Sequence, residues 1–124
     1  MSALSLRGVR ILIVEDNFIL ADALRYLLVG YQATVTALVP SVDQAFAAID
    51  AQAIDVAILD VNLGGTSVIP FAEHLRATGT PFVFVTGYGD DPDLLPEHLR
   101  DHPRLEKPVD GDRLVRAILA VTAR

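Results

Sequence analysis

The sequence contains no cysteine, which excludes both a disulfide framework and a thiolate metal site. Long apolar runs are lacking too: none approaches the ~18 residues that a membrane-spanning helix needs. The first ten residues, MSALSLRGVR, are too short and too broken for a secretory signal peptide. There is no basic cluster and the formal net charge is −6, so nucleic-acid binding is not expected. We therefore expect a cytoplasmic protein that does not enter a membrane.

Apolar residues are abundant enough for one folded domain. The 124 residues are 52% hydrophobic and 21% charged, a composition that supports a sizeable core and argues against disorder. The sequence shows no internal repeat, low-complexity tract or linker. Residues 1–124 are therefore expected to form a single domain.

Two hydrophobic periods alternate along the chain. Short apolar runs rich in β-branched residues predict strands buried on both faces, and they lie at 9–14, 32–39, 55–59 and 81–86. RLEK at 104–107 is predicted as a short fifth strand. Apolar residues at helical spacing follow them, in segment 18–29, behind Ser41, before Gly79 and in segment 111–122. Prolines in segment 87–103 allow at most a short helix near 94–100. This alternation predicts an α/β domain with helices on both faces of a five-stranded parallel sheet, doubly wound and flavodoxin-like, with strand order 2-1-3-4-5.

Local signals predict where three of the helices begin or end. Gly30 stands where a left-handed residue would end the first helix. Ser41 and Gln44 match a capping box at the start of the second. Pro70 is tolerated only in the first turn of the third helix, which Gly79 is expected to end.

Polar side chains follow four of the five predicted strands. Glu15 and Asp16 follow the first strand, Asp60 the third, Thr86 the fourth and Lys107 the fifth. Each has an ordinary structural explanation when taken alone, such as a helix cap for Asp16 or a solvated charge for Lys107. In a parallel α/β sheet, however, ligands bind outside the carboxyl ends of the strands. The pattern therefore predicts a shared site at that edge.

Three carboxylates at one edge of a sheet need a cation. Two unit charges ~4 Å apart repel by roughly 4 kcal/mol at an effective dielectric near 20. Oxygen ligands without cysteine or a nearby histidine favour Mg²⁺ over zinc. Lys107 would supply a positive charge to a phosphoryl group, and Thr86 a hydrogen bond. A carboxylate can be the nucleophile in phosphoryl transfer, which makes Asp60 the candidate for an aspartyl phosphate.

Over essentially its whole length, the sequence resembles the receiver domains of two-component response regulators. ILIVED resembles the acidic pair of the family, here Glu15 and Asp16, and ILDVNLGG resembles its phosphoacceptor strand, which ends in Asp60. FVFVTG places Thr86 at the switch hydroxyl, and LEKP places Lys107 at the lysine of the site. Any one of these motifs would be weak evidence, whereas the whole set is strong.

The resemblance implies a phosphoacceptor module. Glu15, Asp16, Asp60 and the backbone carbonyl of Asn62 would bind Mg²⁺. A sensor histidine kinase or a phosphotransfer protein would donate the phosphoryl group to Asp60, and phosphorylation would switch a surface that binds a downstream protein partner. Such a domain catalyses only its own phosphorylation and dephosphorylation, so we do not expect an enzyme with a separate substrate. A phosphorylation-dependent homodimer is left open.

Two details narrow the resemblance. PFVFVTGYG closely resembles the motif of FATGUY receivers, which are associated with alphaproteobacteria and often consist of a single domain; Val85 replaces an alanine. Many receivers also carry an aromatic residue three positions before the lysine, where this chain has Arg104. The usual aromatic switch is therefore missing, and Tyr88 is a candidate substitute.

Two other functions fit parts of the sequence. A receiver fold that binds its partner without phosphorylation would be consistent with Arg104 and with the proline-broken fourth helix. A Mg²⁺-dependent phosphohydrolase with an aspartyl intermediate often needs a second aspartate two residues after the nucleophile. Here that position is Asn62, which cannot donate a proton in that way.

Overall fold

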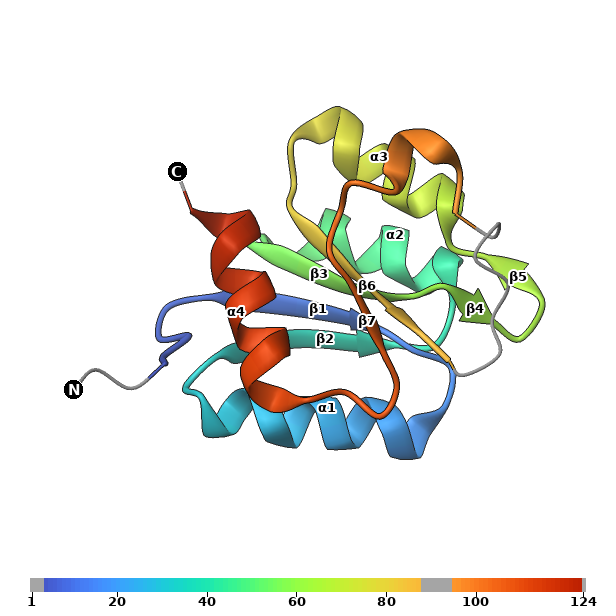
Figure 1. The fold of residues 1–124 in the computed structure, drawn as a ribbon. Helices are drawn as coiled ribbons and strands as arrows, with labels where there is room; N and C mark the ends of the chain where they lie inside the picture. The colour runs from blue at the N-terminus through green and yellow to red at the C-terminus, as the bar shows by residue number, and fades with distance from the viewer. Residues whose placement is uncertain (1–3, 88–94, 124) are drawn as a thin grey trace.

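Five parallel strands form the central sheet of the computed structural model, which describes residues 4–87 and 95–123 (Figure 1). These strands are β1 (Arg10–Val14), β2 (Thr34–Val39), β3 (Val56–Asp60), β6 (Phe82–Thr86) and β7 (Arg104–Glu106). Across the sheet they lie in the order β2-β1-β3-β6-β7, and each neighbouring pair is parallel. The predicted order 2-1-3-4-5 is thereby confirmed.

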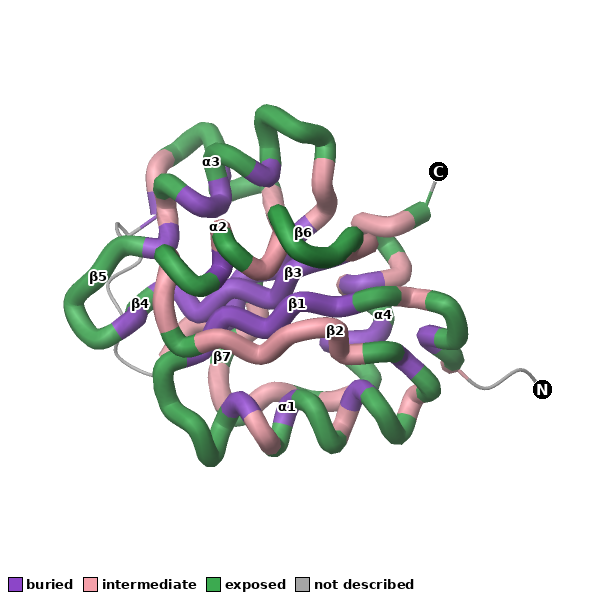
Figure 2. Tube along the Cα trace, turned by 180° about the vertical axis from the view of Figure 1, so that it is seen from behind, coloured by how far each residue is buried: buried purple, intermediate pink, exposed green. Residues whose placement is uncertain are grey.

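Helices cover both faces of this sheet. They are α1 (Phe18–Gly30), α2 (Val42–Ala51), α3 (Ile69–Thr78) and α4 (Gly111–Thr122). α1 and α4 lie on one face, and α2 and α3 lie on the other (Figure 1). The alternation of strand side chains divides the core into two clusters: Leu12 and Ala57 pack toward α2 and α3, whereas Ile11 and Ile58 pack toward α1 and α4. The strands β1, β3 and β6 are the most deeply buried part of the sheet, and Figure 2 shows the buried stretch of β1 and β3.

The end of α1 differs from the prediction made at Gly30. The helix includes Gly30, and the left-handed residue is Gln32, with φ of 75°. The backbone N–H of Gln32 donates to the carbonyl of Val29, and that of Ala33 donates to Leu28. These two bonds form a Schellman motif. Ala33 and Leu28 are both buried in the same cluster, so the hydrophobic contact of the motif fixes the helix end two residues beyond the expected position.

The other helix signals agree with the structure. The backbone N–H of Gln44 donates to Oγ of Ser41 over 3.2 Å, which caps α2. Pro70 lies in the first turn of α3, where its missing N–H removes no helical hydrogen bond. Gly79 follows α3 with φ of 75°, the left-handed conformation that glycine adopts without strain.

A short hairpin between β3 and α3 was not predicted. It pairs β4 (Asn62–Leu63) with β5 (Thr66–Ser67) in antiparallel fashion. The two turn residues, Gly64 and Gly65, both have positive φ, as a type I′ hairpin turn requires. Strands of two residues are too short to produce a hydrophobic period, so the sequence indicated only the turn.

The segment before β7 contains one short helix. A 3-10 turn, η2 (Glu97–Leu99), buries Leu99 in the cluster beneath α2 and α3, in agreement with the short helix expected near 94–100. Tyr88 lies outside the described residues. Within the described part of the chain, no helix has the length and apolarity to cross a membrane.

Candidate functional site

The neighbouring ends of β1 and β3 bring three carboxylates together. The strands run in parallel with Val14 opposite Leu59, so Glu15 and Asp16 emerge beside Asp60. One carboxylate oxygen from each acid lies within 4.8 Å of the other two. Glu15 and Asp60 are buried, whereas Asp16 is exposed. The structure thus places the predicted acids in one cluster that opens to solvent on the Asp16 side.

Lys107 joins this cluster from β7, the strand at the edge of the sheet. Its Nζ atom lies 2.7 Å from Oε1 of Glu15 and 3.5 Å from Oδ2 of Asp60. The backbone N–H of Lys107 donates to the carbonyl of Thr86, which ties the residue to β6. The side chain is 21% exposed, so its ammonium group sits at the boundary between the buried acids and solvent.

Burial and charge shift the pKa values of these three groups in different directions. Burial raises the pKa of Asp60 to about 7, and the hydrogen bond and the negative charge of Glu15 add to this effect. Burial also favours the neutral form of Glu15, but hydrogen bonds with Asp60 and Lys107 outweigh it and hold the Glu15 pKa below its ordinary value. For Lys107, burial is outweighed by the two carboxylates, and the pKa is raised. Lys107 lies closer to Glu15 than to Asp60, so one ammonium group is shared by two buried carboxylates and the charge of Asp60 is the less compensated of the two.

The donor set of the cluster fits a hard divalent cation. Oxygen atoms around one octahedral Mg²⁺ lie ~3–4 Å apart when its bonds are 2.0–2.1 Å long. The three carboxylate oxygens, all within 4.8 Å of one another, need only a small movement to reach such spacing. Three negative charges face one ammonium group, so a divalent ion would neutralise the surplus.

The β4–β5 hairpin is anchored to the cluster through Asn62. The backbone N–H of Asn62 donates to Oδ1 of Asp60 over 3.1 Å. The Asn62 side chain in turn accepts a hydrogen bond from the N–H of Gly65 over 3.3 Å. The hairpin therefore holds the backbone N–H of Asn62 against the Asp60 carboxylate.

Thr86 ends β6, the strand between β3 and β7. Asp60 lies opposite Val85 in the sheet, so Thr86 stands one residue past the carboxylate. Its hydroxyl donates to the carbonyl of Leu105 over 3.5 Å. Thr86 and the exposed Arg104 both line an open cavity of about 800 Å³ between β7 and α4. Thr86, at the edge of the site, therefore lines the same cavity as Arg104.

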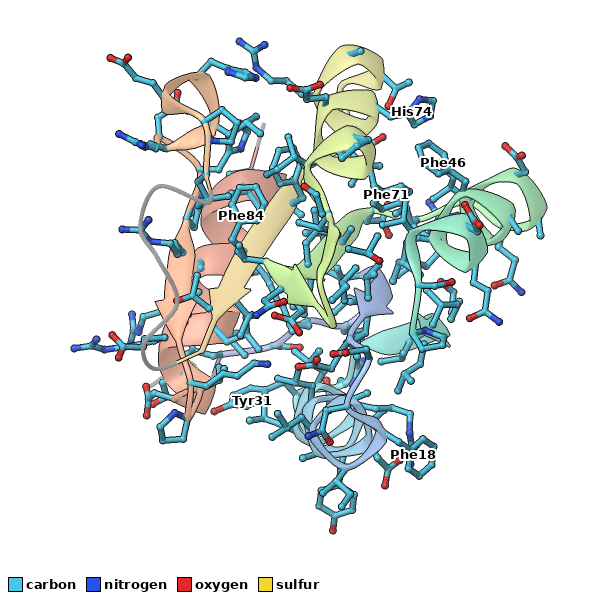
Figure 3. The ribbon with its side chains drawn as sticks, turned by 90° about the vertical axis from the view of Figure 1, so that its right-hand side faces the viewer. Phe18, Tyr31, Phe46, Phe71, His74 and Phe84 are labelled. Carbon is cyan, nitrogen blue, oxygen red and sulfur yellow. The ribbon has the colours of Figure 1, made fainter. Side chains whose placement is uncertain are left out.

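An exposed apolar surface on α1 was missed by the sequence analysis. Its residues are Phe18, Ile19, Tyr26 and Val29, and the first two are 75% and 78% exposed. A signal for it was present, because all four lie off the leucine stripe that packs α1 against the sheet. Phe18 points away from the sheet into solvent (Figure 3).

Comparison with known proteins agrees with this geometry. The family model described as the response regulator receiver domain matches residues 11–119. The chain belongs to this family, and it is therefore a phosphoacceptor receiver module, as the motifs predicted. A search of curated proteins found no match.

Solved structures place the chain near SdrG. It is 42% identical to SdrG from Sphingomonas melonis Fr1, with a TM-score of 0.80 and 100% of both chains covered. The BeF3-activated conformation of SdrG from Pseudomonas melonis Fr1 is 38% identical, with a TM-score of 0.76, covering 99% of this chain and 100% of that one. The signal receiver domain of a modulated diguanylate cyclase from Desulfovibrio desulfuricans G20 is 26% identical, with a TM-score of 0.82, covering 91% of this chain and 92% of that one.

Proposed function

We propose that this receiver domain accepts a phosphoryl group on Asp60 from a phosphohistidine donor, with Mg²⁺ bound at the acidic cluster. The observation that carries the proposal is the position of Asp60 itself. Its carboxylate is buried at the end of β3, lies beside two further acids, and is 3.5 Å from the ammonium group of Lys107. A carboxylate with a purely structural role needs only one partner. The ammonium group beside Asp60 could also bind a phosphoryl group, and the three acids could also bind a divalent cation.

The transfer follows from the chemistry of these groups. An oxygen atom of Asp60 attacks phosphorus, the bond between phosphorus and the imidazole nitrogen of the donor breaks, and the imidazole leaves with the electron pair. Lys107 moves from its ion pair with Glu15 to a phosphoryl oxygen, and the Thr86 hydroxyl donates to another. Glu15, Asp16, Asp60 and the backbone carbonyl of Asn62 would hold Mg²⁺, which would supply positive charge to the phosphoryl oxygens.

Intact mass measurement after incubation with acetyl phosphate tests this proposal. We expect one phosphoryl adduct that forms with Mg²⁺, disappears with excess EDTA and maps to Asp60. Asp60→Asn keeps the shape of the side chain and should abolish the adduct. Asp55→Asn is the matched control, because Asp55 lies at the opposite end of the same strand and should leave uptake unchanged. An adduct of equal yield in the Asp60 variant would overturn the assignment.

The exposed apolar surface on α1 supports a protein as the donor. Phe18 and Ile19 begin the helix two and three residues after Asp16, so a partner that covers them also reaches the open side of the cluster. Apolar side chains this exposed are typical of protein interfaces. We expect Phe18→Ser to slow phosphoryl transfer from an autophosphorylated histidine kinase roughly tenfold, the loss of one interface anchor. The rate with acetyl phosphate should not change, and Tyr26→Ser, two turns farther along the helix, should have a smaller effect.

The downstream surface is proposed to lie around Arg104. The cavity beside β7 joins Thr86, which responds to the phosphoryl group, to charged residues on β7 and α4. Because Arg104 replaces the aromatic residue of many receivers, a phosphorylation-independent interaction module is the second candidate. Affinity for a captured partner, measured with and without phosphorylation, separates the two: a change of severalfold supports the switch, and equal affinities support the second candidate.

A further inference from the structure

The turn of the β4–β5 hairpin lies against the exposed acid of the cluster. A Cβ atom on Gly64 would be 3.1 Å from Oδ2 of Asp16, closer than ordinary van der Waals contact. Gly64 and Asp16 come from different loops, one after β3 and the other after β1. The bare backbone of Gly64 therefore forms one wall of the space that the Asp16 carboxylate occupies.

The neighbouring glycine provides a contrast. Gly65 has φ of 93° and Gly64 has φ of 61°, so both positions lie in the left-handed region and strain any ordinary side chain. A Cβ atom on Gly65, however, would meet no atom of the described residues within 4 Å. Turn geometry therefore explains both glycines, but the approach to Asp16 is a property of Gly64 alone.

Asp16 is the acid whose position depends most on the backbone of Gly64. Glu15 and Asp60 are buried and held by Lys107, whereas Asp16 is exposed. The hairpin that carries Gly64 is itself tied to Asp60 through the backbone N–H of Asn62. The distance between the hairpin turn and Asp60 is thus set, and the Asp16 carboxylate lies in the space between them.

We propose that Gly64 is a positioning residue for the metal site: its lack of a side chain allows the Asp16 carboxylate to lie within ligand distance of Glu15 and Asp60. This inference rests on the proposed Mg²⁺ site. A methyl group at position 64 crowds Oδ2 of Asp16, so the exposed carboxylate has to shift by a few tenths of an ångström. This shift weakens cation binding, while the other two acids and Lys107 stay in place.

Direct titration with Mn²⁺, read by electron paramagnetic resonance and followed by competition with Mg²⁺, tests the proposal without any measurement of activity. We expect Gly64→Ala to raise the dissociation constant about tenfold, the lower end of the effects known for residues that orient metal ligands. The matched control Gly65→Ala carries similar backbone strain and should change it less than about twofold. Equal shifts in the two variants, or no shift in either, would overturn the positioning role.

Two further variants guard against a folding artefact. Gly64→Asn and Gly65→Asn place the same Cβ atoms with less strain, because asparagine tolerates the left-handed region; the same asymmetry between positions 64 and 65 is expected. In an Asp16→Asn background, Gly64→Ala should cause no additional loss, since the two changes act through one carboxylate. An undiminished loss in that background would contradict the proposal.

The phosphorylation rate and the binding of metal by the wild type distinguish an error in the proposed metal site from an error in the role of Gly64. At saturating Mg²⁺, Gly64→Ala should regain the wild-type rate with acetyl phosphate, because only occupancy of the metal site is impaired. If the wild-type chain bound no Mn²⁺ or Mg²⁺, the metal site of the proposed function would itself be wrong. If the wild type bound the ion and Gly64→Ala bound it equally well, only the role of Gly64 would be wrong.

Discussion

The two ends of the central strands hold their charges in opposite ways. At the amino end, Arg10 and Asp55 form a partly exposed ion pair, with Nη2 of Arg10 3.0 Å from Oδ1 of Asp55. The backbone N–H of Arg10 also donates to Asp55 over 2.7 Å. At the carboxyl end of the same strands, Glu15 and Asp60 are buried, and a single lysine, Lys107, serves both.

This difference separates a structural pair from a site. Every charge of the amino-end pair has a partner and remains in contact with solvent, so the arrangement is complete without a ligand. The carboxyl end keeps a surplus of buried negative charge, which raises the free energy of the folded protein until a cation or a proton arrives. Buried negative charge without enough positive charge beside it, rather than the number of charged residues, identifies the functional edge of the sheet.

The largest effect is expected from the loss of the shared lysine. Lys107→Met leaves two buried carboxylates without a cation and should lower the free energy of unfolding by about 3 kcal/mol at pH 8 in EDTA. Urea denaturation measures this value. Added Mg²⁺ should recover part of the loss, because it supplies charge at the same place. A variant as stable as the wild type in EDTA would mean that the acids are not held by this ammonium group.

A smaller effect of opposite sign is expected from Asp60→Asn without metal. The folded-state pKa of Asp60, about 7, lies above its unfolded value, so the folded protein binds more protons between about pH 4 and pH 7. Wild-type stability should therefore fall as the pH rises through this window and level off above it. Asp60→Asn removes that slope and should be more stable by roughly 2 kcal/mol at pH 8, about half of what the full shift from 3.8 to about 7 would give without solvent screening, with little difference near pH 4. Parallel stability curves for the two proteins from pH 4 to pH 8 would contradict the raised pKa.

The smallest effect is expected at the amino end. Arg10→Met removes an exposed partner, and Asp55 keeps the hydrogen bond from the backbone N–H of residue 10. Exposed ion pairs contribute little to stability and are screened by salt. The loss measured by urea denaturation should be well below that of Lys107→Met and should shrink further at ~1 M NaCl. Equal losses in the two variants would remove the contrast between the ends of the sheet.

Much of the site could be predicted because a parallel sheet converts strand order into position. Glu15 and Asp60 each follow an apolar run, Lys107 follows a short fifth strand, and parallel pairing brings all these strand ends to one edge. The distance between these side chains therefore depends on the order of the strands in the sheet, and the alternation of strand and helix patterns in the sequence predicts that order. The receiver family followed from the same residues, since its motifs are the strand ends themselves.

Other features depend on contacts that leave no period in the sequence. The end of α1 is set by the burial of Ala33 against Leu28 and not by Gly30. The β4–β5 hairpin rests on one asparagine side chain, Asn62, and on two left-handed glycines. The approach of Gly64 to Asp16 joins two loops whose relative position only the folded structure defines. Side-chain packing, rather than local propensity, decides each of these cases.

The pairing of Glu15 with Lys107 has a consequence for the timing of folding. The two residues follow the first and the last strand of the sheet in chain order, so most of the chain lies in the loop that their ion pair closes. Such a contact is costly in chain entropy and forms only after the strands between have assembled. A chain still emerging from the ribosome, or one clipped before β7, carries the acids without their lysine. On the proposed function, the complete phosphoryl-accepting site would therefore exist only after β7 has joined the sheet.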